Sequence, residues 1–304
     1  GGGGIIDEPD QPAPSLGELT YRDVASGARA LAAGPESLGV RPGGRVAIVS
    51  QNSARLLSVL YGAPAHGRVA VPINFRRHPD EVDYIVGHCG AEVLLVDPEL
   101  AEQLEAVTAP KKFVIGPETD ELLCRWDLEP TPWEPDAGVT ATINYTSGTT
   151  ARPKGVEMTH RNLWVNAATF GWQAGVDDRD VYLHTLPMFH CNGWGMPYTV
   201  AAMGVRQVVL RKVDGAEILR RVRDHGVTFM CGAPAVVSMI LEAAESWDGP
   251  IPGSGADGRR RVRIIVAGAP PPTRTIERVE TELGWEFIQI YGLTETAPLL
   301  TMNR

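Results

Sequence analysis

The stretch Tyr145-Thr-Ser-Gly-Thr-Thr-Ala-Arg-Pro-Lys-Gly155 gathers small, hydroxylated and cationic residues into a single turn. Glycine at Gly148 and Gly155 allows the backbone to approach a ligand closely. Lys154 adds a positive charge. Phosphate oxygens need hydrogen-bond donors, and the turn offers the hydroxyls of Thr146, Ser147, Thr149 and Thr150. We therefore predict a phosphate-binding loop, with an ordinary surface loop rich in Ser, Thr and Gly as the alternative.

The lysine of this turn is followed by Gly155, whereas the P-loop of nucleotide triphosphatases has Ser or Thr there to reach magnesium. The turn is therefore a different phosphate clamp. It closely resembles the signature of the adenylate-forming, AMP-binding superfamily, which includes fatty acyl-CoA synthetases, luciferases and the adenylation domains of peptide synthetases. Ala151 departs from the Gly that is usual in that family. The resemblance covers nearly the whole chain, from Leu19 to Glu295, and includes Val71-Pro-Ile-Asn74.

A second segment, Ile288-Gln-Ile-Tyr-Gly-Leu-Thr-Glu-Thr-Ala-Pro298, follows an apolar run where a strand is expected to end. Ligands of open α/β sheets bind at such strand ends. The resemblance implies that Tyr291 stacks on adenine, that Thr294 lies near the α-phosphate, and that Glu295 binds Mg²⁺ with the Thr146 hydroxyl. Mg²⁺ prefers such hard oxygen ligands. Gln289 and Gly292 belong to the same nucleotide-binding segment. Taken alone, the segment is also compatible with a strand followed by a capped helix.

Between these two motifs, Leu186-Pro-Met-Phe-His-Cys-Asn-Gly-Trp-Gly-Met-Pro-Tyr198 combines apolar and aromatic residues with one histidine, which is typical of a pocket wall. By resemblance, His190 lies beside the substrate carboxylate and the reacting phosphate, and Trp194 closes the acyl tunnel of long-chain fatty acyl-CoA synthetases. A single His in an apolar run is also typical of a hydrogen-bonded core residue. The expected catalytic residues are Lys154, His190, Thr294 and Glu295.

The turn Gly268-Ala-Pro270 follows an apolar run and resembles the family's adenine-side turn, although Gly and Pro after a strand are common in any turn. Adenylation domains of peptide synthetases carry Asp after Phe to pair with the substrate ammonium group, whereas this chain has Phe189-His190. Burying an ammonium without an anion is costly, so amino acids are disfavoured. We expect a medium- or long-chain fatty acid, ahead of short-chain or aryl acids. The expected acyl-tunnel residues are Trp194, Met196, Cys231, Ala233, Val237 and Ala269.

Composition fits a soluble enzyme domain, with 304 residues, 43% of them hydrophobic, 21% charged and a net charge of −9. The longest apolar runs are strand-sized, so neither a membrane span nor a secretion signal is predicted. Arg259, Arg260 and Arg261 form the one dense basic cluster, which we interpret as a solvated loop rather than a nucleic-acid surface. The four cysteines lack metal-binding spacing, which argues for reduced thiols and a cytoplasmic location.

Short apolar runs alternate with longer amphipathic stretches, which predicts doubly wound, mostly parallel α/β sheets flanked by helices. Strands are predicted at residues 45–50, 69–73, 92–96, 112–115, 140–145, 181–186, 206–210, 227–231, 262–267 and 286–290. Helices are predicted at residues 20–33, where Thr20 and Asp23 form a capping box, and at 53–66, 79–88, 160–172, 216–225, 235–244 and 273–283. Residues 129–136 are expected to be a linker and 247–258 a surface loop.

The resemblance implies that residues 16–304 form a large N-terminal adenylating domain of two interleaved α/β subdomains, with residues 1–15 a leader outside the fold. The family's ribose-binding Asp, its hinge and the catalytic Lys of its mobile C-terminal domain lie beyond the last motif, so the domain is expected to be incomplete. The implied reaction forms an acyl-adenylate from ATP and a carboxylic acid, after which CoA displaces AMP. Without the distal Lys, we expect weak nucleotide binding and slow turnover.

Two alternatives stay open. The chain is also compatible with a non-catalytic nucleotide- or acyl-binding module, or with a different adenylate-forming enzyme such as one that loads a carrier protein. The expected partners are the small molecules ATP, CoA and a carboxylic acid, without nucleic acid. The resemblance also includes relatives that form homodimers, but the residues themselves do not indicate an oligomeric state.

Overall fold

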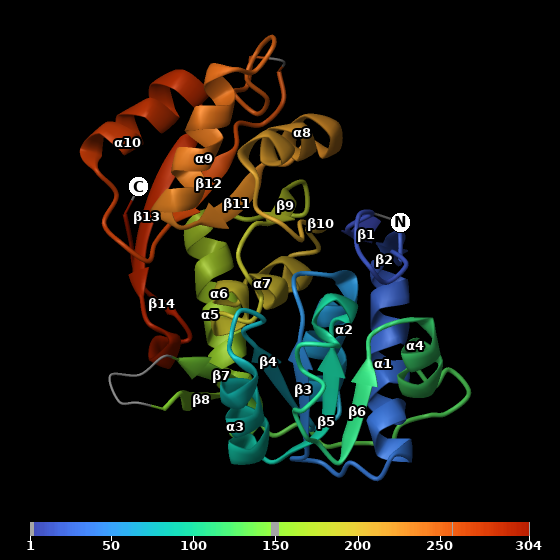
Figure 1. The fold of residues 1–304 in the computed structure, drawn as a ribbon. Coiled ribbons are helices and arrows are strands. Elements are labelled where there is room, and N and C mark those ends of the chain that lie inside the picture. The colour runs from blue at the N-terminus through green and yellow to red at the C-terminus, as the bar shows by residue number, and fades with distance from the viewer. Residues whose placement is uncertain (1–2, 147–151, 257, 304) are drawn as a thin grey trace.

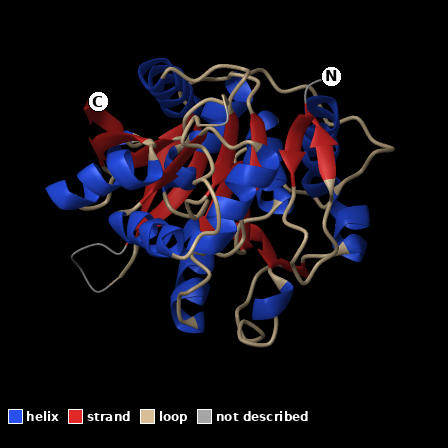
Figure 2. Cartoon of the chain, turned by 90° about the horizontal axis from the view of Figure 1, so that it is seen from above, coloured by secondary structure: helices blue, strands red, loops and turns tan. Residues whose placement is uncertain are grey.

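The chain folds into two β-sheets, and helices cover the strands of both sheets (Figures 1 and 2). The structure is a computed structural model that describes residues 3–146, 152–256 and 258–303. Within these residues, neighbouring strands are parallel except in three pairs at sheet edges, so the expected α/β class with mostly parallel sheets is confirmed.

The eight-stranded sheet lies in the upper half of Figure 1 and the six-stranded sheet in the lower half. In spatial order, the larger sheet contains β14 (Leu299–Asn303), β13 (Glu286–Gly292), β12 (Arg263–Val266), β11 (Phe229–Gly232), β9 (Val181–His184), β10 (Arg206–Val209), β1 (Gly3–Ile6) and β2 (Glu18–Thr20). The smaller sheet contains β6 (Lys111–Val114), β5 (Ala91–Val96), β3 (Arg45–Val49), β4 (Val69–Ile73), β7 (Thr140–Thr146) and β8 (Lys154–Thr159).

Helices connect these strands and cover both faces of each sheet. They are α1 (Tyr21–Ser37), α2 (Ala54–Ala65), α3 (Pro79–Cys89), α4 (Pro117–Leu123), α5 (His160–Ala174), α6 (Cys191–Trp194), α7 (Met196–Ala202), α8 (Gly215–His225), α9 (Pro234–Glu245) and α10 (Thr273–Arg278). Short helical turns occur at η1 (Pro98–Leu100), η2 (Val279–Leu283) and η3 (Thr294–Thr296). None of the helices in the described part of the chain is both long and apolar enough to cross a membrane.

Local sequence explains where the helices begin and end. The predicted capping box of α1 is present, because the Thr20 hydroxyl accepts from the Asp23 amide while the Asp23 carboxylate accepts from the Thr20 amide. Helix α8 is capped by Asp214 and ends at Gly226, whose φ of 66° suits glycine. The inner strands are buried on both faces, and all five residues of β4 are buried, as expected for strands covered by helices on each side.

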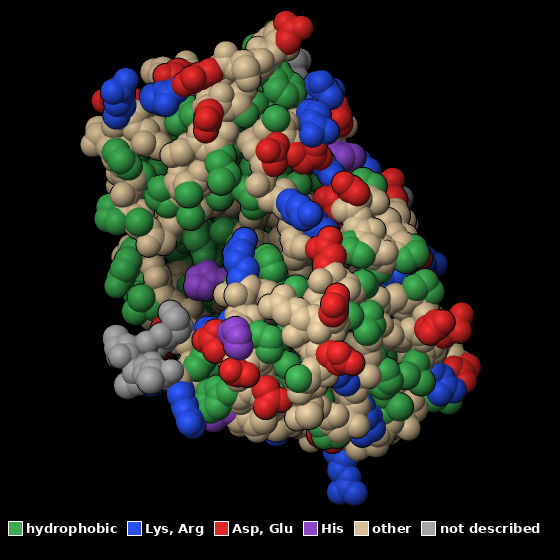
Figure 3. Space-filling view, viewed as in Figure 1, with side chains coloured by type: hydrophobic (Ala, Val, Ile, Leu, Met, Phe, Trp, Pro, Cys, Tyr) green, Lys and Arg blue, Asp and Glu red, His purple; other side chains and the backbone are tan. Residues whose placement is uncertain are grey.

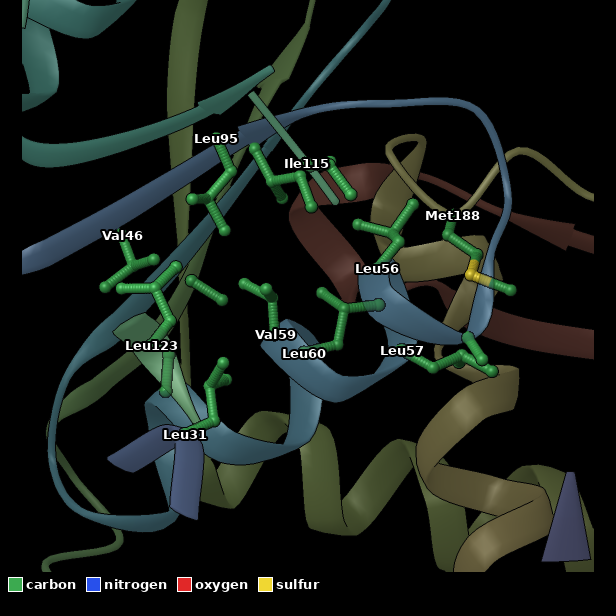
Figure 4. Close-up of a cluster of buried hydrophobic side chains, with 14 of the residues drawn as sticks. Leu31, Val46, Leu56, Leu57, Val59, Leu60, Leu95, Ile115, Leu123 and Met188 are labelled. Atoms are coloured by element: carbon green, nitrogen blue, oxygen red, sulfur yellow. The ribbon is translucent and has the colours of Figure 1, made fainter. Parts of the chain in front are cut away.

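Four hydrophobic clusters form the core, two against each sheet. Figure 4 shows one of them, in which Leu56, Val59 and Leu60 of α2 pack against Val46 and other side chains of the smaller sheet. This cluster also includes Met188, which belongs to the histidine-bearing loop between β9 and β10. The core therefore reaches directly beneath the predicted site.

The N-terminal residues correct the expectation that residues 1–15 lie outside the fold. Gly3–Ile6 form β1, an inner strand that pairs with β10 and β2. The next residue, Asp7, is only 2% exposed, and its carboxylate accepts from the Ala54 amide at the start of α2. Gly4 has room for no side chain, since a Cβ there would lie 2.8 Å from the Leu19 carbonyl oxygen. The expectation failed because glycine repeats lack the hydrophobic signal of a strand.

Buried ion pairs tie the N-terminal segment and the end of β5 to the larger sheet. The Arg211 guanidinium donates to both carboxylate oxygens of Asp97 at 3.0 and 2.9 Å, and both side chains are almost fully buried. Arg221 of α8 pairs with Glu8 at 2.9 Å. A buried charge without its partner is costly, so these pairs hold the end of β5, the N-terminal segment and the larger sheet in one arrangement.

The two predicted loops behave alike. Residues 247–256 form no helix or strand, as predicted, and residues 129–136 likewise form none. The ring of Trp133 nevertheless packs against His160, with ring centres 5.3 Å apart. The basic cluster is solvated as predicted, since Arg259, Arg260 and Arg261 are all exposed, and Arg260 also pairs with Asp177 at 2.8 Å.

Candidate active site

One cavity of about 770 Å³ collects half of the predicted site residues that the structure describes. It lies at the carboxyl ends of the parallel strands in the larger sheet and also reaches β4 and β7 of the smaller sheet, as expected for α/β sheets. Figure 3 shows a hollow between the two halves of the molecule, with apolar side chains inside and a histidine at its edge. The lining residues are Asn74, Arg76, Thr146, Leu186, Pro187, Phe189, His190, Cys191, Trp194, Ala233, Ala267, Gly268, Ile290, Gly292, Leu293, Thr294, Glu295 and Pro298.

The predicted phosphate loop falls between β7 and β8 in the chain, and the structure describes it only at its two ends. Thr146 lines the cavity and is the register partner of Lys154 in the antiparallel ladder, and Lys154 is exposed. Lys154 is not among the described lining residues. Gly155 is exposed, and a Cβ there would lie 3.1 Å from the Tyr145 ring, so the predicted approach of a ligand to its backbone stays a prediction. The predicted donors Ser147, Gly148, Thr149 and Thr150 lie outside the described residues.

The acidic motif occupies the opposite wall. Thr294 and Glu295 lie in η3, directly after β13, and both line the cavity. The hydroxyl of Thr296 stabilises this turn, since it accepts from the Leu293 amide at 3.0 Å. Gly292 must be glycine, because a Cβ would lie 2.0 Å from the Pro298 carbonyl oxygen. Thr146 and Glu295 therefore share one cleft, although 149 positions separate them in the chain.

The histidine-bearing loop forms the third wall. His190 is accessible from the cavity, and desolvation by the surrounding protein lowers the pKa of its imidazole, which favours the neutral ring at neutral pH. Trp194 is 7% exposed, so its ring is largely packed while one part lines the cavity. Burial raises the pKa of the intervening Cys191 thiol to about 12, with a smaller opposing effect from a hydrogen bond to Thr294. The thiol therefore stays protonated beside the acidic motif.

The backbone of this loop has the unusual left-handed conformation. The φ angles of Cys191, Asn192, Gly193 and Trp194 are 48°, 50°, 59° and 59°, and Gly195 follows at 73°. Helix α6 is thus a left-handed turn, closed by a hydrogen bond from the Gly195 amide to the Cys191 carbonyl. Residues with a Cβ seldom adopt this conformation in succession, and such strain is concentrated at functional sites.

Several predicted residues lie elsewhere. Cys231 and Met196 are fully buried in the core cluster that also contains Trp194, and Val237 is fully buried in the cluster on the other face of the sheet. None of the three lines the cavity, which corrects the expected acyl tunnel: their apolar side chains fill the core instead. Ala233 does line it.

The adenine-side predictions are only partly in contact with the cavity. Gly268 lines it, whereas Ala269 and Pro270 are exposed next to it. Tyr291 is 58% exposed, and Gln289 lies within β13, paired with β12 and β14. A half-exposed ring at a strand end is available for stacking, so the predicted adenine contact of Tyr291 stays a prediction.

The structure adds lining residues that the sequence reasoning missed. Arg76 follows β4 and contributes a positive charge, with its guanidinium 4.6 Å from the Phe75 ring centre. Phe75 in turn packs edge-on against Phe189, with ring centres 5.6 Å apart. The strand end at Asn74 was the available signal, because the carboxyl ends of parallel strands gather at one edge of a sheet.

The donor set fits the magnesium ion that the resemblance implies. Among the described lining residues, the cavity presents one carboxylate, on Glu295, and the hydroxyls of Thr146 and Thr294, of which the resemblance implies that of Thr146 as a ligand. Mg²⁺ is usually held by one or two protein oxygens while substrate phosphates and water complete its coordination. Groups of three or more His, Cys, Asp or Glu side chains, which would indicate a site built wholly from protein, do not occur among the described residues.

Comparison with known proteins agrees with this geometry. The family model described as "AMP-binding enzyme" matches residues 7–304. The chain belongs to the AMP-binding enzyme family. The match begins at Asp7, so the family includes most of the N-terminal segment that we had expected to lie outside the fold.

Three curated relatives in the AMP-binding enzyme family illustrate the similarity. A probable acyl-activating enzyme 5 (peroxisomal) of Arabidopsis thaliana is 34% identical, covering 92% of this chain and 53% of its own. A 2-methylpropanoate–CoA ligase of Humulus lupulus is 32% identical, with 89% and 51% covered. A long-chain-fatty-acid–CoA ligase of Thermus thermophilus is 34% identical, with 93% and 53% covered. The chain thus spans about half the length of these relatives.

Solved structures of the AMP-binding enzyme family share the fold. A long-chain-fatty-acid-CoA ligase from Archaeoglobus fulgidus superimposes with a TM-score of 0.88 at 24% identity, over 99% of this chain and 62% of that one. The N-terminal domain of FACL13 from Mycobacterium tuberculosis gives 0.85 at 26% identity, over 99% and 74%. The two-sheet arrangement described above is therefore that of this family.

Proposed function

We propose that this chain forms the nucleotide- and acid-binding part of an ATP-dependent acid–CoA ligase. The observation that carries the proposal is the shared cavity, where Thr146, Glu295 and His190 meet although they come from three distant segments. A phosphate loop, an acidic metal ligand and a neutral imidazole around one apolar cleft suit the joining of a carboxylate to a nucleotide. The relatives named as CoA ligases support this reading.

In the first step, a carboxylate oxygen of the acid attacks the α-phosphorus of ATP, and the bond to pyrophosphate breaks. Both reactants are anions, so the site must neutralise charge and hold them in line. The exposed amine of Lys154 and the hydroxyls of Thr146 and Thr294 offer positive charge and donors for phosphate oxygens. Bound Mg²⁺ would be held by Glu295 and Thr146 and would supply further charge neutralisation.

His190 donates a hydrogen bond in this scheme. The lowered pKa of its imidazole keeps the ring neutral, so that it can donate to the substrate carboxylate without holding that anion in a tight ion pair. In the second step, the thiol of CoA attacks the acyl carbon and AMP leaves. The chain spans about half of its relatives' length. Both steps are therefore proposed for a whole enzyme of that length and not for these residues alone.

The acid is proposed to carry an apolar tail. Apolar side chains such as Leu186, Ile290 and Trp194 dominate the lining, and Glu295 is the sole acidic side chain among the described lining residues. An amino acid substrate would therefore bury its ammonium group without a dedicated partner. A medium- or long-chain fatty acid is our first candidate, and the Thermus relative supports it. The Humulus relative, whose name gives a short branched acid, makes the short-chain alternative the main competitor.

Calorimetry with ATP and AMP, followed by a pyrophosphate-release assay with carboxylic acids of increasing length, tests this function. We expect measurable nucleotide binding, slow turnover of the chain alone, and acid-dependent pyrophosphate release. Replacing Trp194 with Ala removes the largest side chain of the wall and should shift the preference toward longer acids. No binding of either nucleotide would contradict the function, and rapid turnover would contradict the expected need for the distal lysine.

We also propose a reducing, cytoplasmic setting. All four cysteines are free, and three of them, Cys89, Cys191 and Cys231, are buried. Fractionation of the producing cell with an antibody against the chain would locate it; recovery in an organelle fraction would contradict the proposal.

A further inference from the structure

Four buried asparagines surround the loop that carries His190 and Trp194. Asn52, Asn144, Asn166 and Asn192 are 6%, 1%, 5% and 0% exposed. They come from four separate places: the turn after β3, strand β7, helix α5 and the loop itself. The side chains of Asn52, Asn144 and Asn166 form hydrogen bonds with residues 184–194. The side chain of Asn192, which lies in the loop, bonds to Asn144 and Thr142.

The central pair is reciprocal. The Asn144 amide nitrogen donates to the Asn192 side-chain oxygen at 3.1 Å, and the Asn192 backbone amide donates to the Asn144 side-chain oxygen at 3.0 Å. The Asn192 side-chain nitrogen donates to the Thr142 hydroxyl at 2.8 Å. Asn144 and Thr142 belong to β7, the strand that ends at Thr146. The loop is thereby bonded to the strand that leads into the phosphate loop.

Asn166 extends the same connection to the acidic motif. Its side-chain nitrogen donates to the Trp194 carbonyl at 3.2 Å, and its side-chain oxygen accepts from the Leu299 amide at 3.2 Å. Leu299 begins β14, which pairs back onto β13 on the far side of Thr294 and Glu295. Asn52 holds the start of the loop, donating to the Leu186 carbonyl at 2.8 Å and accepting from the Met188 amide at 2.9 Å.

These bonds explain how a left-handed turn persists in this loop. Cys191, Asn192 and Trp194 all have positive φ, which is unfavourable for residues that carry a Cβ. Such a conformation persists only where its surroundings over-determine it. Buried amides with several well-placed partners do so, because releasing the turn would leave buried polar groups unpaired.

We infer that Asn144, Asn166 and Asn192 are positioning residues, which hold His190 and Trp194 in register with Thr146 and Glu295. They contact no substrate themselves. They act on the side of the cavity that would bind the acid, and this choice of ligand rests on the proposed function. The hydrogen bonds that hold the turn do not depend on that function. Losing a tether should release the left-handed turn, expose Cys191 and weaken binding of the acyl group more than binding of the nucleotide.

The first experiment measures alkylation of individual cysteines in the folded chain by iodoacetamide and peptide mass spectrometry. Cys191 lies within the turn and is 3% exposed, whereas Cys231 in β11 is 0% exposed and reports global opening. The variants are Asn192→Gly, which keeps the left-handed preference without the side chain, Asn144→Ala and Asn166→Ala. Gln173→Ala, at an exposed position of α5, is the matched control.

We expect Cys191 to react about tenfold faster in each tether variant, while Cys231 stays within about twofold of wild type. The control should match wild type at both cysteines. Unchanged protection of Cys191 in a folded variant would overturn the inference, as would equal acceleration at both cysteines, which indicates general destabilisation. If Asn192→Gly fails to fold, Asn166→Ala still decides, because alanine is favourable within a helix.

The second experiment measures binding of AMP and of a non-hydrolysable acyl-sulfamoyl adenosine by calorimetry. The tether variants should lose about tenfold in affinity for the acyl analogue and less than about threefold for AMP. Equal losses for both ligands would overturn the positioning role. If the wild-type chain binds AMP but no acyl analogue, the proposed function fails instead, and cysteine alkylation alone decides whether the asparagines hold the turn.

Discussion

Thr146 and Lys154 face each other as the last register pair of the β7–β8 ladder. This pairing fixes both ends of the predicted phosphate loop on the smaller sheet. The acidic motif that completes the site belongs to the larger sheet. Nucleotide binding would therefore depend on how the two sheets are held together, and the buried Arg211–Asp97 pair is one of the contacts that do so.

Replacing Lys154 with Ala should weaken ATP binding about tenfold and slow pyrophosphate release about 10²-fold, since one charged donor to the phosphates is lost. Lys154→Arg keeps the charge and should recover part of the affinity. Calorimetry and the release assay measure both effects. Lys212→Ala, which removes a lysine from a different cavity, is the control and should behave as wild type. Equal losses in the two alanine variants would point to net charge rather than to a specific contact.

Glu295→Gln should make ATP binding nearly independent of magnesium. The amide keeps the shape of the side chain but removes the anionic oxygen that Mg²⁺ prefers. Titrations with ATP in magnesium and in EDTA measure the difference, which we expect to fall from about tenfold in wild type to about twofold in the variant. The exposed Glu280 offers a control through Glu280→Gln. A full magnesium response in Glu295→Gln would exclude this carboxylate as a ligand.

Two helical glycines should respond to alanine with opposite signs. At Gly34 in α1, a Cβ would lie 1.9 Å from the Leu123 carbonyl oxygen, so Gly34→Ala should destabilise the chain by at least about 2 kcal/mol. At Gly87 in α3 no atom lies within 4 Å of that position, so Gly87→Ala should stabilise by up to about 1 kcal/mol. Urea unfolding midpoints measure both. Similar effects at the two sites would show that helix propensity, rather than contact, governs them.

Stability should fall in mild acid because of His184. Full burial lowers the pKa of its imidazole from 6.5 to about 4, while its ring nitrogen lies 2.8 Å from the Gln207 side-chain oxygen. The unfolded chain protonates this imidazole near pH 6.5, whereas the folded chain protonates it only near pH 4. The free energy of unfolding is therefore at its full value above pH 6.5 and declines as the pH falls from 6.5 to about 4, the window in which only the unfolded chain is protonated.

The decline from this one group amounts to about 3 kcal/mol by the lower end of the window. Urea unfolding at a series of pH values measures it. The variant His184→Gln removes the titrating group and should flatten the curve over this range, whatever its overall stability. An unchanged slope in the variant would assign the acid sensitivity to other residues.

Hydrophobic pattern was sufficient to predict the inner strands. All ten predicted strands occur within a few residues of their expected positions, because strands buried on both faces form distinct apolar runs. The four unpredicted strands are β1, β2, β8 and β14, and three of them are antiparallel edge strands. Edge strands carry polar or small residues and bury fewer side chains, so their pattern resembles that of loops.

The site was predictable where chemistry is tied to a motif. The phosphate-loop motif and the acidic motif, together with the rule that ligands bind at the ends of parallel strands, predicted that Thr146 and Glu295 line one cleft. The left-handed turn at Asn192 did not, because it depends on hydrogen-bond partners more than twenty residues away in the chain. Cys231 and Val237 were misplaced for a related reason: an apolar residue suits a tunnel wall and a packed core equally, and only the direction of its side chain separates them.

The position of β1 determines the order in which this molecule can be completed during synthesis. Its inner neighbour β10 lies about two hundred positions further along the chain, as do Arg211 and Arg221, the partners of Glu8. Residues 3–8 are thus synthesised long before the segments they pair with, and the six-stranded sheet can assemble before the eight-stranded one closes. Until then the edge of β10 that receives β1 is unpaired, and an unpaired strand edge can pair with other chains.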